Sequence, residues 1–109
     1  MTVTLITGAA SGLGWAMARY WFQAGHCLVL ADINAEALLR RRDELGDDTR
    51  VQIVTVDVTS SADLARLIRE TEDTFGRLDL LVNNAGITHR SPAAATDPQV
   101  FRRVMAVDW

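Results

Sequence analysis

The sequence predicts an α/β fold in which helices cover both faces of a doubly wound parallel sheet. Short apolar runs alternate with longer amphipathic segments, and the apolar runs contain few polar residues. Strands separated by helices need crossover connections and are therefore parallel. Continuous apolar strands are typical of a sheet buried on both faces. Right-handed crossovers then give one half of a doubly wound sheet, with strand order 3-2-1-4.

The first three elements come from the N-terminal third of the chain. Residues 3–7 are apolar and rich in β-branched side chains, which predicts a buried strand. Residues 12–24 carry apolar side chains at helical spacing, and Gly25 stands where a glycine would end that helix. Residues 27–31 form a second apolar run and predict the second strand.

The middle of the chain continues the alternation. Asn34 is a suitable cap for a second helix, which the Gly-Asp-Asp sequence at 46–48 ends. We expect the arginines at 40–42 to lie on the solvated face of this helix, because acidic residues surround them. Residues 51–56 predict the third strand.

The remaining elements complete the predicted half-sheet. Ser60 or Ser61 caps a third helix, which ends at Gly76, and residues 79–82 predict the fourth strand. Residues 87–96 are expected to form a loop, and a last helix starts at Asp97-Pro98 and continues to the end of the chain. Without a fifth strand, the apolar fourth strand would be an exposed edge that favours association with other chains.

Composition excludes several classes of protein. The 109 residues include 49% hydrophobic and 23% charged residues, which is ordinary for a globular domain. With a net charge of −3, the chain has no excess of basic residues that would bind nucleic acid or an anionic membrane. No apolar run is long enough to span a bilayer. The single cysteine, Cys27, lies in an apolar run and cannot form an intrachain disulfide or a zinc cluster. We therefore expect a cytoplasmic protein without a metal site.

A glycine-rich segment follows the first predicted strand. Residues 7–14 read Thr-Gly-Ala-Ala-Ser-Gly-Leu-Gly and lead into a predicted helix. Glycines permit a sharp turn and let a pyrophosphate approach the backbone, where free N–H groups at the helix start bind its charge. No Lys-Ser/Thr follows the last glycine, so this is not a Walker loop. The alternative is a tight turn that binds nothing.

An acidic residue follows the second strand at the position that a dinucleotide site requires. Asp32 lies 18 residues after Gly14, where a carboxylate can accept hydrogen bonds from ribose hydroxyls. It would also repel the 2′-phosphate of NADP, and the neighbouring positions Ile33 and Ser11 are not basic. This favours NAD. The alternative is that Asp32 only caps the following helix.

Three motifs together carry a family resemblance. The spacing Gly8-x-x-x-Gly12-x-Gly14, the pair Asp57-Val58 after the third strand and the sequence Asn-Asn-Ala-Gly at 83–86 occur in this order. The chain resembles, over its whole length, the N-terminal half of the short-chain dehydrogenase/reductase family, which has a Rossmann-type fold. The resemblance implies an oxidoreductase that transfers a hydride between NAD and an alcohol or carbonyl substrate, and a parent protein that is a homo-oligomer.

The resemblance also implies residue roles. The backbone N–H groups of Ser11 and Leu13 would face the pyrophosphate, Asp57 would accept a hydrogen bond from the adenine amino group, and Val58 would meet a ring nitrogen. Residues 84–86 would line the adenosine ribose. The residues expected to bind the cofactor are, in all, Gly8, Ser11, Gly12, Leu13, Gly14, Asp32, Ile33, Asp57, Val58, Asn84, Ala85 and Gly86.

The chain departs from the family pattern in its catalytic residues. The family uses a Ser and a Tyr-x-x-x-Lys pair, in which the tyrosine is the general acid/base and the lysine lowers its pKa. All eleven basic residues here are Arg, and the one tyrosine is Tyr20 on the first predicted helix. Asp108 stands where the family has a proton-relay asparagine, and an ionised Asp cannot donate as an amide does.

Three functions therefore remain open. The chain is predicted to be the NAD-binding N-terminal portion of a single short-chain dehydrogenase/reductase domain, truncated before the catalytic Tyr and Lys. The first alternative is a dinucleotide-binding module without catalysis. The second is an inactive and poorly soluble fragment.

Overall fold

The computed structural model describes residues 1–84 and the backbone of residues 104–106. In this described part, five parallel strands form one sheet in the order β3-β2-β1-β4-β5, which confirms the predicted order 3-2-1-4 and adds a strand. The strands are β1 (Val3–Thr7), β2 (Cys27–Asp32), β3 (Val51–Thr55), β4 (Leu80–Asn83) and β5 (Val104–Ala106), and the helices are α1 (Gly12–Gln23), α2 (Ala35–Leu45) and α3 (Ser61–Phe75).

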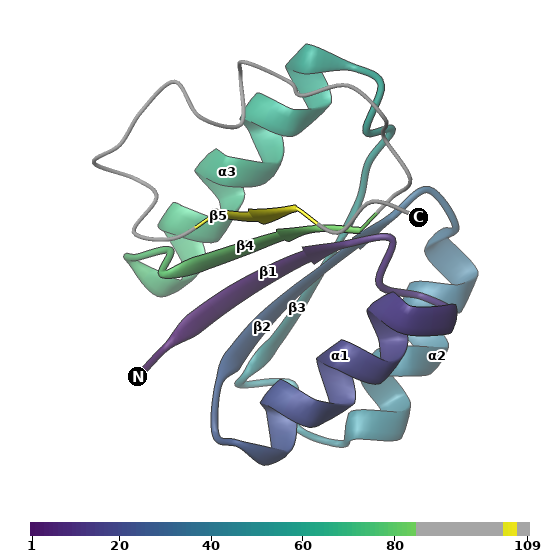
Figure 1. Ribbon diagram of the computed structural model, residues 1–109, viewed down its shortest axis with the longest axis vertical. Helices are drawn as coiled ribbons and strands as arrows, with labels where there is room; N and C mark the ends of the chain where they lie inside the picture. Colours follow the sequence, from purple (N-terminus) through teal and green to yellow (C-terminus); the bar gives the residue numbers. More distant parts are fainter. Residues whose placement is uncertain (85–103, 107–109) are drawn as a thin grey trace.

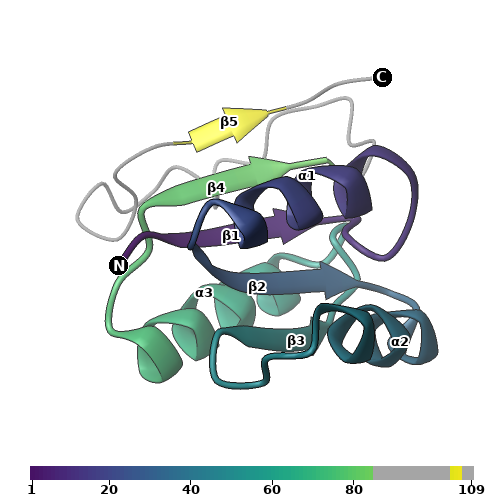
Figure 2. The same ribbon diagram turned by 90° about the horizontal axis from the view of Figure 1, so that it is seen from below.

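Helices cover both faces of the sheet. α1 and α2 lie on one face and α3 lies on the other (Figure 1, Figure 2). Successive strand residues point to opposite faces. Leu5 and Val29 therefore pack toward α3, whereas Ile6 and Leu30 pack beneath α1 and α2. All four side chains are fully buried, which explains why these two strands carry apolar side chains on both faces.

Local capping determines where α2 and α3 begin and end. The side chains of Asn34 and Ser60 each accept a hydrogen bond from a backbone N–H three residues later, at 3.0 and 3.2 Å. Gly46 and Gly76 end the two helices in the left-handed region, with φ of 77° and 75°. The predicted caps are confirmed, with Ser60 rather than Ser61 at α3. None of the three helices in the described residues is long and apolar enough to cross a membrane.

The C-terminal prediction was wrong. Residues 104–106 form β5, which pairs in parallel with β4 from Leu81↔Val104 to Asn83↔Ala106, where a helix was expected to continue to the end of the chain. Helical spacing is a local signal, whereas the outer edge of β4 offers unpaired N–H and C=O groups that another strand can satisfy. In the structure β5 covers the edge of β4 that was expected to be exposed. The expected loop at 87–96 and the start of the expected helix lie outside the described residues.

His26 connects α1 to the sheet at the amino ends of the strands. Its Nδ1 lies 2.8 Å from Thr4 Oγ1, and its ring stacks on Trp21 with the centroids 6.4 Å apart. Burial lowers the pKa of His26 from its ordinary value of 6.5, Asp79 opposes this shift, and the positive charge of Arg50 adds to it. The fold therefore favours the neutral imidazole.

We expect the free energy of unfolding to fall as the pH drops below 6.5. The pKa of His26 is lower in the folded chain than in the unfolded chain, so the unfolded chain binds more protons in this window. The contribution of His26 to the free energy of unfolding is complete above pH 6.5 and is lost as the pH falls through the lowered pKa of the folded chain. Urea denaturation at a series of pH values measures how the free energy of unfolding changes with pH, and His26→Gln should abolish this slope.

The carboxyl pKa values of Asp47 and Asp57 are lowered from 3.8, so these groups titrate outside the window. Equal slopes in both proteins would contradict this expectation.

Candidate functional site

A cavity of about 380 Å³ opens at the carboxyl end of the sheet. Its walls come from the residues that end β2 or immediately follow β1, β2, β3 and β4. β1 lies between β2 and β4 in the sheet. The chain passes from β1 to β2 and β3 on one side and then crosses to β4 on the other side, so the strand order reverses at β1. Such a switch point is where open α/β sheets bind ligands. The lining residues are Gly8, Ser11, Asp32, Ile33, Val56, Asp57, Val58 and Asn84.

The first wall is the glycine loop between β1 and α1. Gly8 and Gly12 have φ of 63° and 58°, which is the left-handed region that side chains disfavour. A Cβ added at Gly12 would meet no atom within 4 Å, so this turn faces open space. At Gly14, by contrast, a Cβ would overlap the Gly8 carbonyl oxygen and lie 2.6 Å from Asn84 Nδ2. Gly12 therefore keeps the loop open to a ligand, and Gly14 lets α1 pack directly against the end of β1.

The N-terminus of α1 is electrostatically suited to an anion. Ser11 occupies the cap position, but its side chain makes no capping hydrogen bond, and the first turn holds no acidic residue. In α2 and α3 a side chain caps the helix, and Glu36 or Asp63 lies in the first turn. The free N–H groups and the helix dipole of α1 thus remain available to a negatively charged group.

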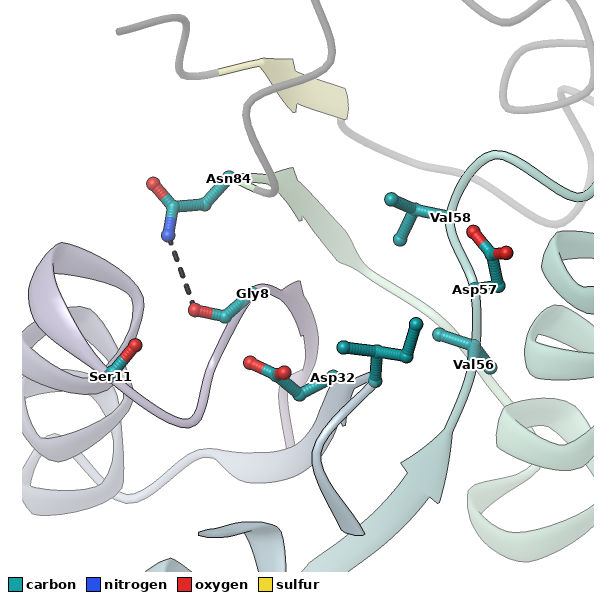
Figure 3. Close-up of a pocket in the computed structure, with 8 residues that line it drawn as sticks. Gly8, Ser11, Asp32, Val56, Asp57, Val58 and Asn84 are labelled. Carbon is teal, nitrogen blue, oxygen red and sulfur yellow. Dashed lines mark hydrogen bonds between the residues drawn. The ribbon is translucent and has the colours of Figure 1, made fainter.

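Asp32 lies beside this loop, on the same side of the sheet. Its Oδ2 accepts a hydrogen bond from the Ala10 N–H at 3.1 Å, and its Oδ1 accepts one from the Asn34 N–H, also at 3.1 Å. Figure 3 shows the carboxylate between the loop that carries Gly8 and Ser11 and the opposite wall. Each carboxylate oxygen can accept more than one hydrogen bond, so both can still receive a hydroxyl.

The opposite wall follows β3. Val56 is 2% exposed and its N–H donates to the Asp32 carbonyl oxygen at 3.0 Å, which brings β3 up to the end of β2. Asp57 Oδ1 accepts hydrogen bonds from the Thr59 N–H and hydroxyl, at 2.9 and 2.6 Å. These bonds hold the pKa of the Asp57 carboxyl below its ordinary value of 3.8. Val56 and Val58 therefore form an apolar surface with an ionised acid beside it (Figure 3).

Asn84 joins the end of β4 to the glycine loop. Its backbone N–H donates to Thr7 Oγ1 at 2.9 Å, and its Nδ2 donates a long hydrogen bond of 3.4 Å to the Gly8 carbonyl oxygen. Asn83 Oδ1 accepts a hydrogen bond from the same Thr7 hydroxyl at 3.1 Å. The two asparagines thus fix the position of β4 relative to the turn that follows β1.

Comparison with known proteins identifies this arrangement. The sequence model of the short chain dehydrogenases matches residues 2–109, which is nearly the whole chain. The chain belongs to the short-chain dehydrogenase/reductase family. Members of this family are oxidoreductases.

Individual relatives agree with this assignment. The chain is 37% identical over 106 residues to 3beta-hydroxysteroid dehydrogenase 2 of Eggerthella lenta, and this match covers 95% of the chain and 41% of the relative. A short-chain dehydrogenase/reductase from Burkholderia phymatum in complex with NAD matches at a TM-score of 0.74 and 40% identity, covering 79% of this chain and 31% of that one. The C-domain of a bacterial malonyl-CoA reductase with NADP matches at a TM-score of 0.75 and 31% identity, covering 82% and 15%. The chain thus spans less than half the length of these relatives.

Most of the site residues predicted from this family are brought together. Seven of them line the cavity, and Gly12, Leu13 and Gly14 form the first turn of α1 next to it without lining it. Ala85, Gly86 and Asp108 lie outside the described residues. Sequence reasoning missed Val56, although its place as the last apolar residue before Asp57-Val58 could have indicated it. The residues expected to bind the cofactor that line the cavity are Gly8, Ser11, Asp32, Ile33, Asp57, Val58 and Asn84.

The expected position of the arginine cluster was partly wrong. Arg40 is exposed as predicted, but Arg41 and Arg42 are only partly exposed. Arg41 Nε donates to the Ala10 carbonyl oxygen at 2.8 Å, so its side chain reaches the glycine loop. The apolar stem and planar guanidinium of an arginine can pack over a neighbouring helix, which a pattern of surrounding charges does not reveal.

Proposed function

We propose that this chain is the NAD-binding portion of a short-chain dehydrogenase/reductase, and that the whole protein transfers a hydride between NAD and an alcohol or carbonyl substrate. The observation that carries the proposal is the cavity between the uncapped N-terminus of α1 and the carboxylate of Asp32. Bound NAD would accept or donate the hydride, and the residues of this chain would bind and orient it.

Each wall of the cavity suits one part of the dinucleotide. In this proposal the N–H groups of Ser11 and Leu13 bind the diphosphate, because the first turn of α1 has no competing cap or acid. Asp32 accepts the hydroxyls of the adenosine ribose. The adenine lies between Val58 and Ile33, whose side chain is 70% exposed, and contacts both. Asp57, whose carboxyl is held ionised, accepts a hydrogen bond from the adenine amino group.

The catalytic tyrosine and lysine are proposed to lie elsewhere in the whole protein. Tyr20 is 69% exposed on α1 and does not line the cavity, and the chain contains no lysine. The same observation favours, as a second candidate, a module that binds NAD without catalysis. The two are distinguished by assaying the whole protein for NAD-dependent oxidation of alcohols, which only the first predicts.

We expect the chain to bind NAD at least about tenfold more tightly than NADP, a difference of about 1.4 kcal/mol. The 2′-phosphate of NADP would lie against the Asp32 carboxylate, and no basic side chain lines the cavity in the described residues to offset this repulsion. Isothermal titration calorimetry with NAD and NADP measures the ratio. Equal affinities, or tighter binding of NADP, would overturn the assignment to NAD.

A further inference from the structure

Two side chains of opposite charge hold the main chain of Ala10, in the middle of the glycine loop. The Ala10 N–H donates to Asp32 Oδ2 at 3.1 Å, and the Ala10 carbonyl oxygen accepts from Arg41 Nε at 2.8 Å. Asp32 stands at the end of β2, whereas Arg41 lies on α2. Ala10 itself is 3% exposed. Both are charge-assisted hydrogen bonds, which are stronger than bonds between neutral groups.

Further contacts fix the orientation of the Arg41 guanidinium. Nη1 donates to Glu44 Oε2 at 2.9 Å, and the guanidinium carbon lies 4.7 Å from the centroid of the Trp15 ring. Trp15 is 8% exposed and belongs to the first turns of α1. Arg41 therefore connects α2, the glycine loop and α1, and its two engaged donors point in directions set by its neighbours.

The Ala10–Ser11 peptide connects the group that Arg41 binds to an N–H group at the cavity. In a trans peptide the C=O of one residue and the N–H of the next point in opposite directions. The described residues contain no cis peptide bond. Arg41, which does not line the cavity, holds the Ala10 carbonyl, and Ser11, which does line it, carries the N–H of the same peptide. A hydrogen bond on one side of the peptide thus determines the direction of the donor on the other side.

We infer that Arg41 is a positioning residue for the diphosphate-binding N–H groups, and that it acts through the Ala10 carbonyl without touching the cofactor. The inference rests on the proposed function, because it assigns the Ser11 N–H to an anion. Arg41 does not line the cavity, and its Nε and Nη1 bind Ala10 and Glu44 of the protein itself. Lysine at this position would keep the charge but lose the fixed Nε donor.

Arg41→Lys is the variant that tests the inference, and Arg40→Ala is the control. Arg40 is exposed on the same helix, so Arg40→Ala removes a positive charge without removing a contact to the loop. Calorimetry with ADP and with adenosine separates diphosphate binding from nucleoside binding. We expect Arg41→Lys to weaken ADP binding roughly tenfold, the size of effect that loss of an outer-shell partner has at metal sites, and to leave adenosine binding unchanged. Arg40→Ala should change neither affinity.

A second readout does not depend on ligand binding. The Ser11 amide resonance of the ¹⁵N-labelled, unliganded chain should shift in Arg41→Lys and not in Arg40→Ala. An unchanged Ser11 amide, or an equal loss of ADP and adenosine affinity, would overturn the inference. If the unsubstituted chain binds neither ADP nor NAD, the proposed function fails, and the Ser11 amide alone then decides whether Arg41 positions the loop.

Discussion

Asp32→Asn is expected to weaken NAD binding by about ten- to hundredfold, which corresponds to the roughly 1.5–3 kcal/mol of a hydrogen bond to a charged group. The carboxylate accepts from two backbone N–H groups, at 3.1 Å each, and in the proposal it also accepts the ribose hydroxyls. An amide has only one acceptor oxygen, so at least one of these partners must lose its bond. NADP should lose less affinity than NAD, because the substitution also removes the repulsion of its 2′-phosphate.

The ratio of the two affinities is the informative quantity in this experiment. A general loss of folded protein would reduce both affinities together, whereas the loss of a ribose contact reduces mainly that for NAD. Asp43→Asn, at an exposed position on α2, makes the same change in net charge away from the cavity and should leave both affinities unchanged. An Asp32→Asn chain that still prefers NAD over NADP to the original degree would show that Asp32 does not select the cofactor.

Gly14→Ala should lower the free energy of unfolding by about 3 kcal/mol, the upper end of the usual range for overpacking. The added Cβ would overlap the Gly8 carbonyl oxygen, which is main chain and cannot rotate away, and would lie 2.6 Å from Asn84 Nδ2. To relieve the overlap, α1 must move away from β1, and the cavity wall moves with it. A thermal melt should show a decrease of about 10–15 °C in Tm.

Gly46→Ala is the matched control for this substitution. Gly46 has φ of 77° and nothing within 4 Å of an added Cβ, so alanine there meets backbone strain but no neighbour. Strain of this kind costs about 1 kcal/mol. If Gly14→Ala destabilises the chain no more than Gly46→Ala does, the close packing of α1 on the end of β1 is not required.

The parts of the fold that were predictable from sequence are those that depend on neighbouring residues. β1, β2 and β4 are short, mostly apolar and buried runs because both of their faces are covered, whereas β3 at the edge of the sheet includes the partly exposed Gln52 and the exposed Thr55. Asn34, Ser60, Gly46 and Gly76 act within one helical turn, so their roles are visible locally. The glycine spacing and Asp32 were informative because the loop and the carboxylate follow adjacent parallel strands, whose carboxyl ends meet at one edge of the sheet.

The features that were missed depend on contacts between distant segments. Arg41 reaches Ala10 across 31 positions of sequence, and no spacing rule relates a residue in the middle of one helix to the loop before another. Strand β5 exists through its pairing with β4, which overrides the local helical spacing of its residues. Val56 joins the cavity because its N–H bonds to the carbonyl of Asp32 on the neighbouring strand.

The most direct test of the account is a ¹⁵N–¹H correlation spectrum of the chain during titration with NAD. If the diphosphate binds at the start of α1, the amides of Ser11, Gly12 and Leu13 shift together with those of Asp32 and Ile33. In that case the amides of Ser61 and Ala62, at the capped N-terminus of α3, stay in place. Saturable NAD binding that shifts residues elsewhere and leaves the α1 amides unmoved would contradict the proposed site.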